Sequence, residues 1–234
     1  MRIFNRVEAF SPDPKQPLVL SLGNFDGVHA GHQLILNRNL ESARSIQGKA
    51  AVFTFEKHPQ AVLHPEARPR LLTSTPHKIY LLEKLGLDFC FLIPFTESFS
   101  KITTEDFIKN ILVKHLGVRK VVLGYNARFG RGRKGDAALM KKFSLALGFE
   151  FEEVPAVQIA GETVSSTRVR SLVEKGLIEE AKVCLKRPFS VFGKVIKGEG
   201  RGKSLGFPTA NLNIDAEILP PFGVYPVRVQ QLDL

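Results

Sequence analysis

The chain reads GNFDGVHAGH from Gly23 to His32, directly after the apolar run from Leu18 to Leu22. An apolar run that ends in glycine and leads into a helical pattern is typical of a strand, a tight turn and a helix. Small residues let the backbone approach an anion, helix N-terminal N–H groups point toward it, and imidazoles donate to phosphate oxygens. The stretch therefore predicts a phosphate-binding turn. The alternative is an ordinary turn with a surface histidine.

Apolar segments alternate with helical patterns up to about residue 150. Strands are expected at 18–22, 51–55, 89–93 and 121–123, and helices at 32–46, 76–85, 104–116 and 137–147. Strand–helix alternation predicts an α/β fold with a parallel sheet. The expected helix boundaries are N-caps at Thr103 or Thr104 and C-terminal glycines at Gly86, Gly117 and Gly148. The turns 23–32 and 124–136 both begin at carboxyl ends of strands, where such sheets bind ligands.

The pattern changes after about Lys186. Apolar segments at 191–196, 211–214 and 224–229 flank a Gly/Arg-rich stretch, which predicts antiparallel strands and a second domain. We therefore expect one domain over 1–185 and another over 186–234. With strands of roughly 5 to 6 residues, the second part supplies only part of a closed barrel.

Composition limits the class of protein. The 234 residues are 44% hydrophobic, which suffices for an ordinary core, and no run approaches the roughly 20 apolar residues of a membrane span. Cys90 and Cys184 have no metal-type spacing and are expected to be buried free thiols in a cytoplasmic protein. The net charge of +10 fits nucleic acid or small polyanions. Glycines interleave the basic run from Arg128 to Lys134, which favours a loop closing over nucleotide phosphates.

Two strand ends carry candidate ring-binding groups. Phe55 and His58 follow the second strand and are predicted to stack on a flat ring and to donate to a phosphate, whereas Phe53 is expected in the core. Asn126, Arg128 and Phe129 follow the fourth strand and supply an amide, a guanidinium and an aromatic ring. A solvated basic turn is the alternative for the second segment, but such a turn needs neither the amide nor the ring.

The segment VSSTRVR, from Val164 to Arg170, predicts a helix start that binds phosphate. Ser166 and Thr167 can cap the helix and bind an anion, and Arg170 lies one turn further on. A plain N-cap would need only one of these side chains. Arg168 is expected to face solvent.

A Gly-rich run from Gly198 to Asn211 reads GEGRGKSLGFPTAN. Glycines allow a loop to wrap a nucleotide, and Thr209 and Asn211 would present two neutral oxygens on one face of an extended segment, which suits Mg²⁺ bound with ATP phosphates. The alternative is a Gly-rich hairpin. The residues predicted to bind this second nucleotide are Gly198, Gly200, Gly206 and Pro208.

Taken in order, these motifs resemble those of the bifunctional bacterial riboflavin kinase/FMN adenylyltransferase family, also called FAD synthetase. The resemblance implies a Rossmann-like nucleotidyltransferase domain followed by a flavokinase β-barrel. It implies MgATP along the first turn, FMN beside it, and AMP transfer with His29, His32 and Arg170 as catalytic residues. The residues it implies for ATP are Gly23, Asn24, Phe25, Asp26, Gly31, Ser166 and Thr167, and those for flavin are Phe55, His58, Asn126, Arg128 and Phe129.

The chain departs from the family pattern at three places. Lys57 stands where the family has proline, which affects a turn more than a ligand, and Ala127 replaces a phenylalanine that packs on the flavin. The family's catalytic kinase glutamate lies beyond the segment that ends at Leu234, so the resemblance implies a fragment or a defective kinase half. The implied partners are FMN, riboflavin and ATP, with a homo-oligomer left open.

Three other functions stay open on the sequence alone. The same superfamily includes enzymes with other phosphate acceptors, although the second Gly-rich run argues against them. A basic nucleic-acid-binding protein would bind with steep salt dependence and retain no flavin. A flavin regulator or chaperone without turnover would keep its function when His29 is replaced by alanine.

Overall fold

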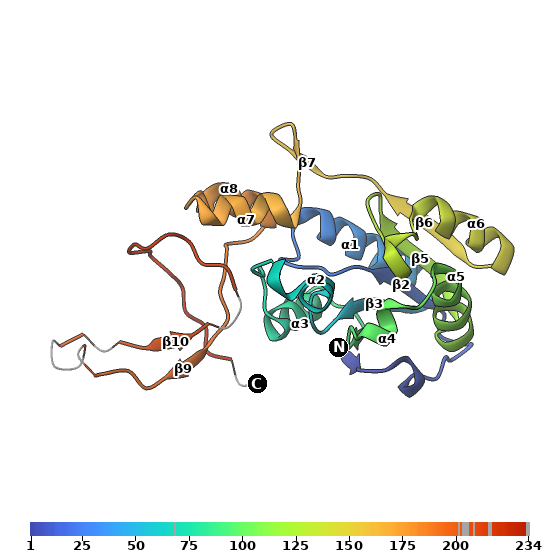
Figure 1. Ribbon diagram of the computed structural model, residues 1–234, viewed down its shortest axis with the longest axis horizontal. Helices are drawn as coiled ribbons and strands as arrows, with labels where there is room; N and C mark the ends of the chain where they lie inside the picture. The colour runs from blue at the N-terminus through green and yellow to red at the C-terminus, as the bar shows by residue number, and fades with distance from the viewer. Residues whose placement is uncertain (68, 201, 203–205, 208, 215–216, 233–234) are drawn as a thin grey trace.

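The computed structural model describes residues 1–67, 69–200, 202, 206–207, 209–214 and 217–232. A six-stranded sheet with the order β1-β4-β3-β2-β5-β6 forms its main body (Figure 1). Each pair of neighbours in this sheet is parallel, which confirms the predicted α/β fold. The strands are β1 (Arg2–Phe4), β2 (Leu18–Leu22), β3 (Lys49–Phe55), β4 (Phe89–Ile93), β5 (Val118–Gly124) and β6 (Glu150–Val154).

Helices cover both faces of the sheet because successive strand side chains point in opposite directions. On one face Leu20 and Phe53 pack with η3, and on the other Val19 and Val52 pack with α1 and α3. The helices are α1 (Ala30–Ser45), α2 (Pro59–Leu63), α3 (Thr75–Lys84), α4 (Glu97–Ser100), α5 (Thr104–Asp106), the π-helical η3 (Phe107–His115), α6 (Ala137–Leu147), α7 (Ser166–Glu174) and α8 (Ile178–Leu185). The short 3-10 turns are η1 (Val7–Ala9), η2 (Pro65–Ala67) and η4 (Arg131–Arg133).

Most predicted boundaries agree with the structure. Strands 18–22 and 89–93 and helix 137–147 have the expected limits, and the glycines after α3, η3 and α6 have positive φ. The side chain of Thr103, not Thr104, caps α5 by accepting from Asp106 N. The helix predicted over 104–116 is instead one α-turn followed by a π-helix. Edge strands β1 and β6 were not predicted, since β1 has three residues and β6 carries three glutamates.

The C-terminal part contains an antiparallel pair, β9 (Lys194–Ile196) and β10 (Asn211–Asn213), as predicted. The strand expected at 224–229 does not form, and its valines lie exposed without a pairing partner among the described residues. A second small pair, β7 (Gln158–Ile159) and β8 (Glu162–Thr163), precedes α7. Figure 1 shows β9 and β10 lying to one side of the sheet body. The domain boundary at 185/186 and the partial barrel stay predictions.

The C-terminal part contacts the sheet body at the buried residues Glu217 and Ile218, among other places. Glu217 forms an isolated parallel β-bridge with Leu71, in which Ile218 N donates to Leu71 O at 2.7 Å. The Glu217 carboxylate accepts from Ser74 N at 2.6 Å and from Phe192 N at 2.9 Å, and it lies 3.0 Å from His77 Nδ1. Burial raises the pKa of Glu217, but hydrogen bonds from His77 and Ser74 outweigh it and hold the pKa below its usual value. This carboxylate therefore connects the two parts of the chain.

Both cysteines are buried and free, as predicted. Burial raises the pKa of the Cys90 thiol to about 12, so this thiol is inert at neutral pH. Among the described residues no helix is both long and apolar enough to cross a bilayer.

Candidate functional site

The turn from Gly23 to His32 connects β2 to α1 at the carboxyl edge of the sheet. His29 is the N-cap of α1, and its Nδ1 accepts from His32 N at 3.4 Å. The two imidazole rings are stacked, with centroids 3.7 Å apart and 17° between their planes. Gly31 permits this stack, because a Cβ there would lie 3.3 Å from the His29 ring. α1 begins at Ala30, two residues earlier than predicted, because His29 supplies the cap.

Burial keeps both histidines neutral. It lowers the pKa of His29 to about 4, with smaller contributions from the charges of Arg187 and Arg170. Burial also lowers the pKa of His32 well below its usual value. Since Nδ1 of His29 accepts a hydrogen bond, the neutral ring carries its hydrogen on Nε2 and can donate it. Nδ1 of His32 is buried and has no hydrogen-bond partner among the described residues.

The backbone of the turn is strained, and a buried carboxylate holds it in place. Phe25 and Val28 have φ values of 51° and 40°, in a left-handed region that residues other than glycine seldom adopt. Asp26 Oδ1 accepts from Leu72 N at 2.9 Å and from Thr73 N at 3.1 Å. Burial raises the pKa of Asp26, against these hydrogen bonds and the charge of Arg170. Asp26 thus fastens the turn to the segment before α3.

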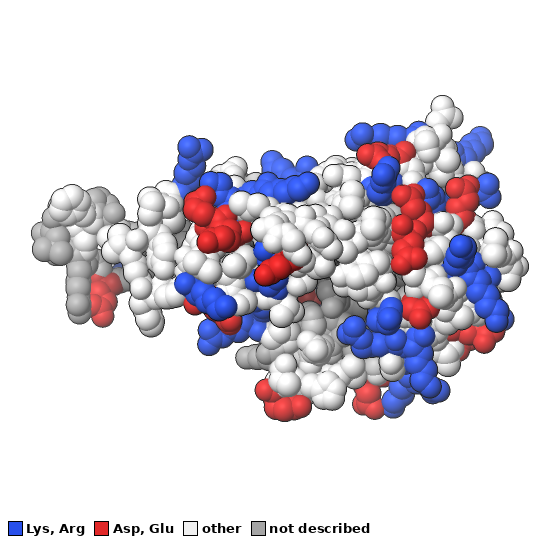
Figure 2. Space-filling view, turned by 90° about the horizontal axis from the view of Figure 1, so that it is seen from above, with Lys and Arg blue, Asp and Glu red and all other residues white. Residues whose placement is uncertain are grey.

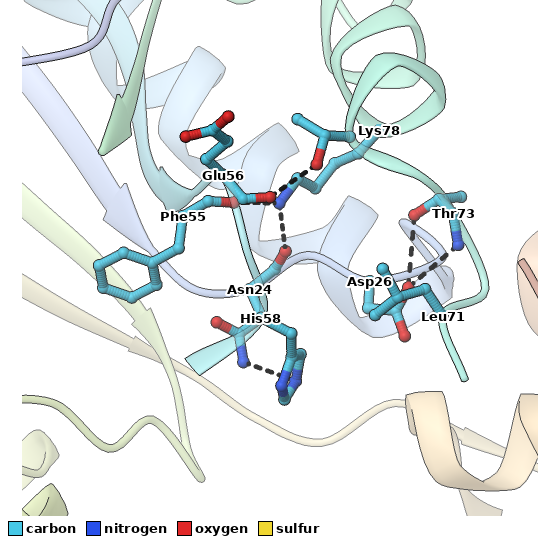
Figure 3. Close-up of a pocket in the computed structure, with 9 residues that line it drawn as sticks. Asn24, Asp26, Phe55, Glu56, His58, Leu71, Thr73 and Lys78 are labelled. Carbon is cyan, nitrogen blue, oxygen red and sulfur yellow. Dashed lines mark hydrogen bonds between the residues drawn. The ribbon is translucent and has the colours of Figure 1, made fainter. Parts of the chain in front are cut away.

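A pocket of about 270 Å³, its open mouth included, lies beside this turn (Figure 3). His58 is the N-cap of α2, its Nδ1 accepts from Gln60 N, and its Nε2 lies 3.2 Å from the Asn24 side chain. Burial lowers the pKa of His58 to about 4, with further effects from Arg170, Lys78 and Arg133. The pocket is lined by Asn24, Asp26, Phe55, Glu56, His58, Leu71, Thr73, Thr75 and Lys78.

Sequence reasoning missed Lys78, which forms the floor of this pocket. Its Nζ donates to Phe55 O at 2.8 Å and to Asn24 O at 3.3 Å (Figure 3). It also donates to Thr54 Oγ1 at 3.2 Å. Burial lowers the pKa of Lys78 to about 8, against the charges of Cys90 and Asp26, which raise it. The lysine therefore joins the end of β3 to the histidine turn. A lysine in an amphipathic helix is ordinarily expected to face solvent, so no sequence signal distinguishes Lys78.

The two phenylalanines predicted to bind flavin, Phe55 and Phe129, pack against other aromatic rings. Phe53 lies in the core, as predicted. Phe55 packs edge-on against Phe95 and Phe99, with ring centroids 5.0 and 5.5 Å away, and also lines the pocket. Phe129 lies 5.8 Å from Phe107 and is partly buried against the same core.

The loop after β5 turns back on itself at the same edge of the sheet. Phe129 and Gly135 exchange backbone hydrogen bonds, and Arg131 N donates to Ile102 O. Asn126 is exposed, and the exposed Arg128 donates only to Ala127 O in the described structure. The charge of Arg133 contributes to the lowered pKa of His58. Both predicted loops begin at the carboxyl ends of the neighbouring parallel strands β2 and β5.

α7 begins at Ser166, as the VSSTRVR segment predicts. The cap is Ser165, which accepts from Arg168 N, and not Ser166 or Thr167 as expected. Ser166 Oγ instead donates to Asp26 O at 2.9 Å. Thr167 is exposed at the helix start. The expectation that Arg168 faces solvent is wrong, because its guanidinium donates to Ile159 O and Glu162 O and pairs with Glu162. The β7–β8 hairpin, which was not predicted, supplies these acceptors.

Arg170 points from α7 toward the histidine turn. Its Nη2 lies 3.7 Å from Asp26 Oδ2, a loose ion pair. Asp26 Oδ2 and Arg170 Nε are buried and have no hydrogen-bond partner among the described residues. Unpaired buried polar groups are costly, at roughly 1–3 kcal/mol each, and such groups gather where a ligand completes the site.

The C-terminal Gly-rich run lies apart from this site and is exposed. Gly198 faces the side chain of Asn211 so closely that a Cβ would collide with it. Thr209 and Asn211 are both exposed, two residues apart, as an extended segment requires. Gly200 and Gly206 have positive φ, and Pro208 lies outside the described residues. Among the described residues no group of three or more His, Cys, Asp or Glu side chains could hold a metal.

Charge on the surface is mixed. Figure 2 shows Lys and Arg side chains in separate groups, with acidic and uncharged residues between them. On this face the described residues form no continuous basic surface of the kind that follows a nucleic-acid backbone.

Two family models match the chain, FAD synthetase over residues 11–168 and riboflavin kinase over residues 185–233. A bifunctional riboflavin kinase/FMN adenylyltransferase of Escherichia coli (strain K12) is 34% identical over 98% of this chain and 73% of its own length. The protein of that name from Listeria monocytogenes is 35% identical over 90% of this chain and 67% of its own.

Solved structures show the same fold. A structure described as a macrolide-efflux protein from Streptococcus pneumoniae superposes with a TM-score of 0.79 at 28% identity, covering 93% of this chain and 70% of that one. A pantoate-β-alanine ligase from Francisella tularensis, complexed with an ATP analogue and β-alanine, has a TM-score of 0.50 at 15% identity, over 77% of this chain and 76% of its own. At that identity the second match speaks for the fold alone.

Proposed function

The chain belongs to the FAD synthetase family, and from that premise we propose that it transfers AMP from MgATP to FMN at the carboxyl edge of its parallel sheet. Residues 185–233 match the riboflavin kinase family, so FAD biosynthesis is the process in which both parts take part. The substrates of this proposal are FMN and ATP for the first part, and riboflavin and ATP for the second.

One observation carries the proposal most directly. The stacked, neutral histidine pair lies at the N-terminus of the 16-residue helix α1, where the backbone N–H groups favour an anion. Arg170 Nε lies nearby, buried and without an acceptor among the described residues. A site built of neutral and cationic donors, with its nearest carboxylate engaged by Leu72 and Thr73, is suited to a polyphosphate.

The proposed reaction needs no covalent intermediate with the protein. An oxygen of the FMN phosphate attacks the α-phosphorus of ATP, the bond from that phosphorus to the bridging oxygen breaks, and pyrophosphate leaves with the bond's electrons. An FMN phosphate is ionised near neutral pH, so the attack requires no protein base. His29 donates through Nε2–H to a phosphate oxygen, His32 lies stacked against it, and Arg170 stabilises the charge that develops on the leaving group.

The remaining predicted residues have proposed roles in binding. Gly23, Asn24, Phe25, Asp26 and Gly31 shape the turn for ATP, and Ser166 joins that turn to α7. Phe55 and His58 form a wall of the pocket in which we propose the flavin lies, with Asn126, Arg128 and Phe129 on the facing loop. Alignment of the two phosphates at this edge supplies most of the expected catalysis.

Magnesium accompanies ATP in this proposal. Thr209 and Asn211 offer two neutral oxygens on one face of an exposed segment, which suits Mg²⁺ held jointly with ATP phosphates in the riboflavin kinase part. Gly198, Gly200, Gly206 and Pro208 are the proposed nucleotide-binding residues there.

A product analysis tests the proposal. The full chain is incubated with MgATP and either FMN or riboflavin, and flavins are separated by HPLC with fluorescence detection. We expect FAD from FMN. The His29→Asn variant is the informative control, because asparagine retains an N-cap acceptor while removing the imidazole donor, and it should lower kcat by about 100-fold or more.

Two results would contradict the proposal. A folded chain, checked by circular dichroism, that forms no FAD points to another phosphate acceptor or, with salt-dependent nucleic-acid binding, to the nucleic-acid alternative. Equal rates of FAD formation in the original chain and in His29→Asn would show that His29 has no role in catalysis. FMN formed from riboflavin measures the kinase part separately.

A further inference from the structure

Arg187 lies in the segment that matches riboflavin kinase, two residues after α8 ends. The end of α8 is fastened to the start of α1, because Gln33 Nε2 donates to Leu185 O at 2.7 Å and to Val28 O at 2.8 Å. Gln33 N in turn donates to His29 O at 2.9 Å. These contacts bring the chain at 185–187 against the histidine turn and not against the C-terminal strands.

The conformation of Lys186 then sets the direction of the chain. It has φ 52° and ψ 26°, the left-handed region that a lysine adopts only under constraint, and its side chain is exposed. Leu185 and Cys184 before it are buried against α7. The chain therefore turns sharply at Lys186, and the next residue, Arg187, directs its guanidinium inward.

Two of the three nitrogens of the Arg187 guanidinium are buried and lack acceptors in the described structure. Its Nε and Nη1 atoms are inaccessible and have no hydrogen-bond partner among the described residues. Burial lowers the pKa of Arg187 to about 10, so the side chain remains protonated at neutral pH. A buried cation with unpaired donors is unfavourable in an empty site and is satisfied by an anion, for which a guanidinium is well shaped.

The surroundings of Arg187 point to the same site as the histidines. Its charge contributes to the lowered pKa of His29, as does that of Arg170, and the Gln33 contacts independently bring Leu185 beside the histidine turn. Asp26 is the carboxylate that pairs with Arg170, and its other oxygen is engaged by Leu72 and Thr73. The site therefore has an excess of positive charge at the N-terminus of α1.

We infer that Arg187 binds the polyphosphate of ATP in the adenylyl transfer site, so that the segment matching riboflavin kinase supplies a residue to the other active site. The identity of the anion as ATP rests on the proposed function, whereas the anion site itself rests on the contacts above. An arginine with a purely structural role would be expected to donate to protein acceptors, and Nε and Nη1 of Arg187 have none among the described residues.

The test compares Arg187→Met with Lys186→Asn in the full chain. Methionine keeps much of the side-chain volume without charge, and asparagine removes an adjacent exposed charge at a left-handed position that it tolerates. Calorimetric titrations with ATP and, separately, with inorganic tripolyphosphate give the affinities. We expect Arg187→Met to weaken both about 10- to 100-fold, with FMN affinity changed less than twofold, and Lys186→Asn to match the original chain.

An unchanged affinity of folded Arg187→Met for ATP and tripolyphosphate would overturn the inference. If Arg187→Met does not fold, Arg187→Lys decides, since it retains the charge but loses the planar fork: a several-fold weaker affinity supports the inference and an equal affinity refutes it. Failure of the proposed function is distinguishable, because the original chain would then form no FAD while tripolyphosphate binding still depended on Arg187. FAD formation that persists with unaltered ATP affinity in Arg187→Met would leave the function intact and refute this role alone.

Discussion

The chain contains two Gly-rich loops with opposite surroundings. The loop from Gly23 to His32 is buried and held by the Asp26 carboxylate, Lys78 and the start of α1. The loop from Gly198 to Asn211 connects two three-residue strands whose side chains are exposed. Glycine allows close approach in both loops, at Gly31 beside the His29 ring and at Gly198 beside Asn211, so burial and not glycine content distinguishes them. We expect donors to be preorganised only in the first.

Removing the carboxylate that holds the first loop should have the largest effect. In Asp26→Ala the backbone N–H groups of Leu72 and Thr73 lose their acceptor in a buried place. We expect the free energy of unfolding to fall by about 3 kcal/mol and FAD formation to fall at least 100-fold. Urea unfolding and HPLC measure the two effects. Asp26→Asn, which retains an acceptor oxygen, should lose less than half as much stability; equal losses would assign the effect to charge.

The next effect is the pH dependence that Lys78, beside the first loop, gives to the free energy of unfolding. Its pKa is lowered to about 8 by burial, whereas an unfolded lysine titrates near 10.5. Between these values the unfolded chain binds a proton that the folded chain does not, so the free energy of unfolding rises with pH. Relative to Lys78→Met, the original chain should gain about 2 kcal/mol between pH 7.5 and 9.5 in urea unfolding. Parallel pH profiles for the two proteins would show that the lysine titrates normally.

A smaller effect is expected at the contact between the two parts of the chain. In Glu217→Gln an amide group replaces one of the two oxygens that accept from Ser74 N and Phe192 N. We expect the free energy of local opening at these amides to fall by about 1 kcal/mol, measured by hydrogen exchange. Glu174→Gln, an exposed carboxylate on α7, is the matched control and should leave the exchange unchanged. Unaltered protection in Glu217→Gln would mean that apolar contacts alone hold the segment.

The smallest effect is expected at Val195, which is compared with Val19. Val19 in β2 is fully buried, whereas Val195 in β9 is 71% exposed. Val19→Ala should lower the free energy of unfolding by about 2 kcal/mol, and Val195→Ala by less than about 0.5 kcal/mol. Chemical unfolding of the two variants side by side gives the values. Similar losses at both positions would indicate that β9 is covered in solution.

The sequence predicts the part of this fold that has strong apolar periodicity. β2, β4 and α6 have clear patterns and firm ends, and their limits agree with the structure. β6 carries three glutamates at the edge of the sheet and has no apolar run, so its pairing with β5 could not be foreseen. The expected strand at 224–229 has an apolar pattern but no partner strand among the described residues.

The candidate site likewise has residues that local motifs predict and residues that they do not. His29, His32 and Arg170 belong to local motifs, and the structure brings them together at one edge of the sheet. Lys78 and Arg187 belong to no local pattern, since each is a single cation whose role depends on which elements pack around it. The hydrogen bonds of Arg168 were missed for the same reason, because its acceptors come from a hairpin of two-residue strands. The roles of these positions depend on which elements pack around them in the folded chain, and no local sequence pattern contains that information.

The strained turn at Phe25 and Val28 bears on how this enzyme family could be adapted to heat. Val28 is β-branched and has φ 40°, a conformation that costs of order 1–3 kcal/mol. Glycine at position 28 would relieve this strain but would also remove a buried side chain from the core. The same change would loosen the residue that directly precedes the N-cap histidine. Variants chosen for a higher melting temperature should therefore accumulate elsewhere in the chain if they are also required to make product.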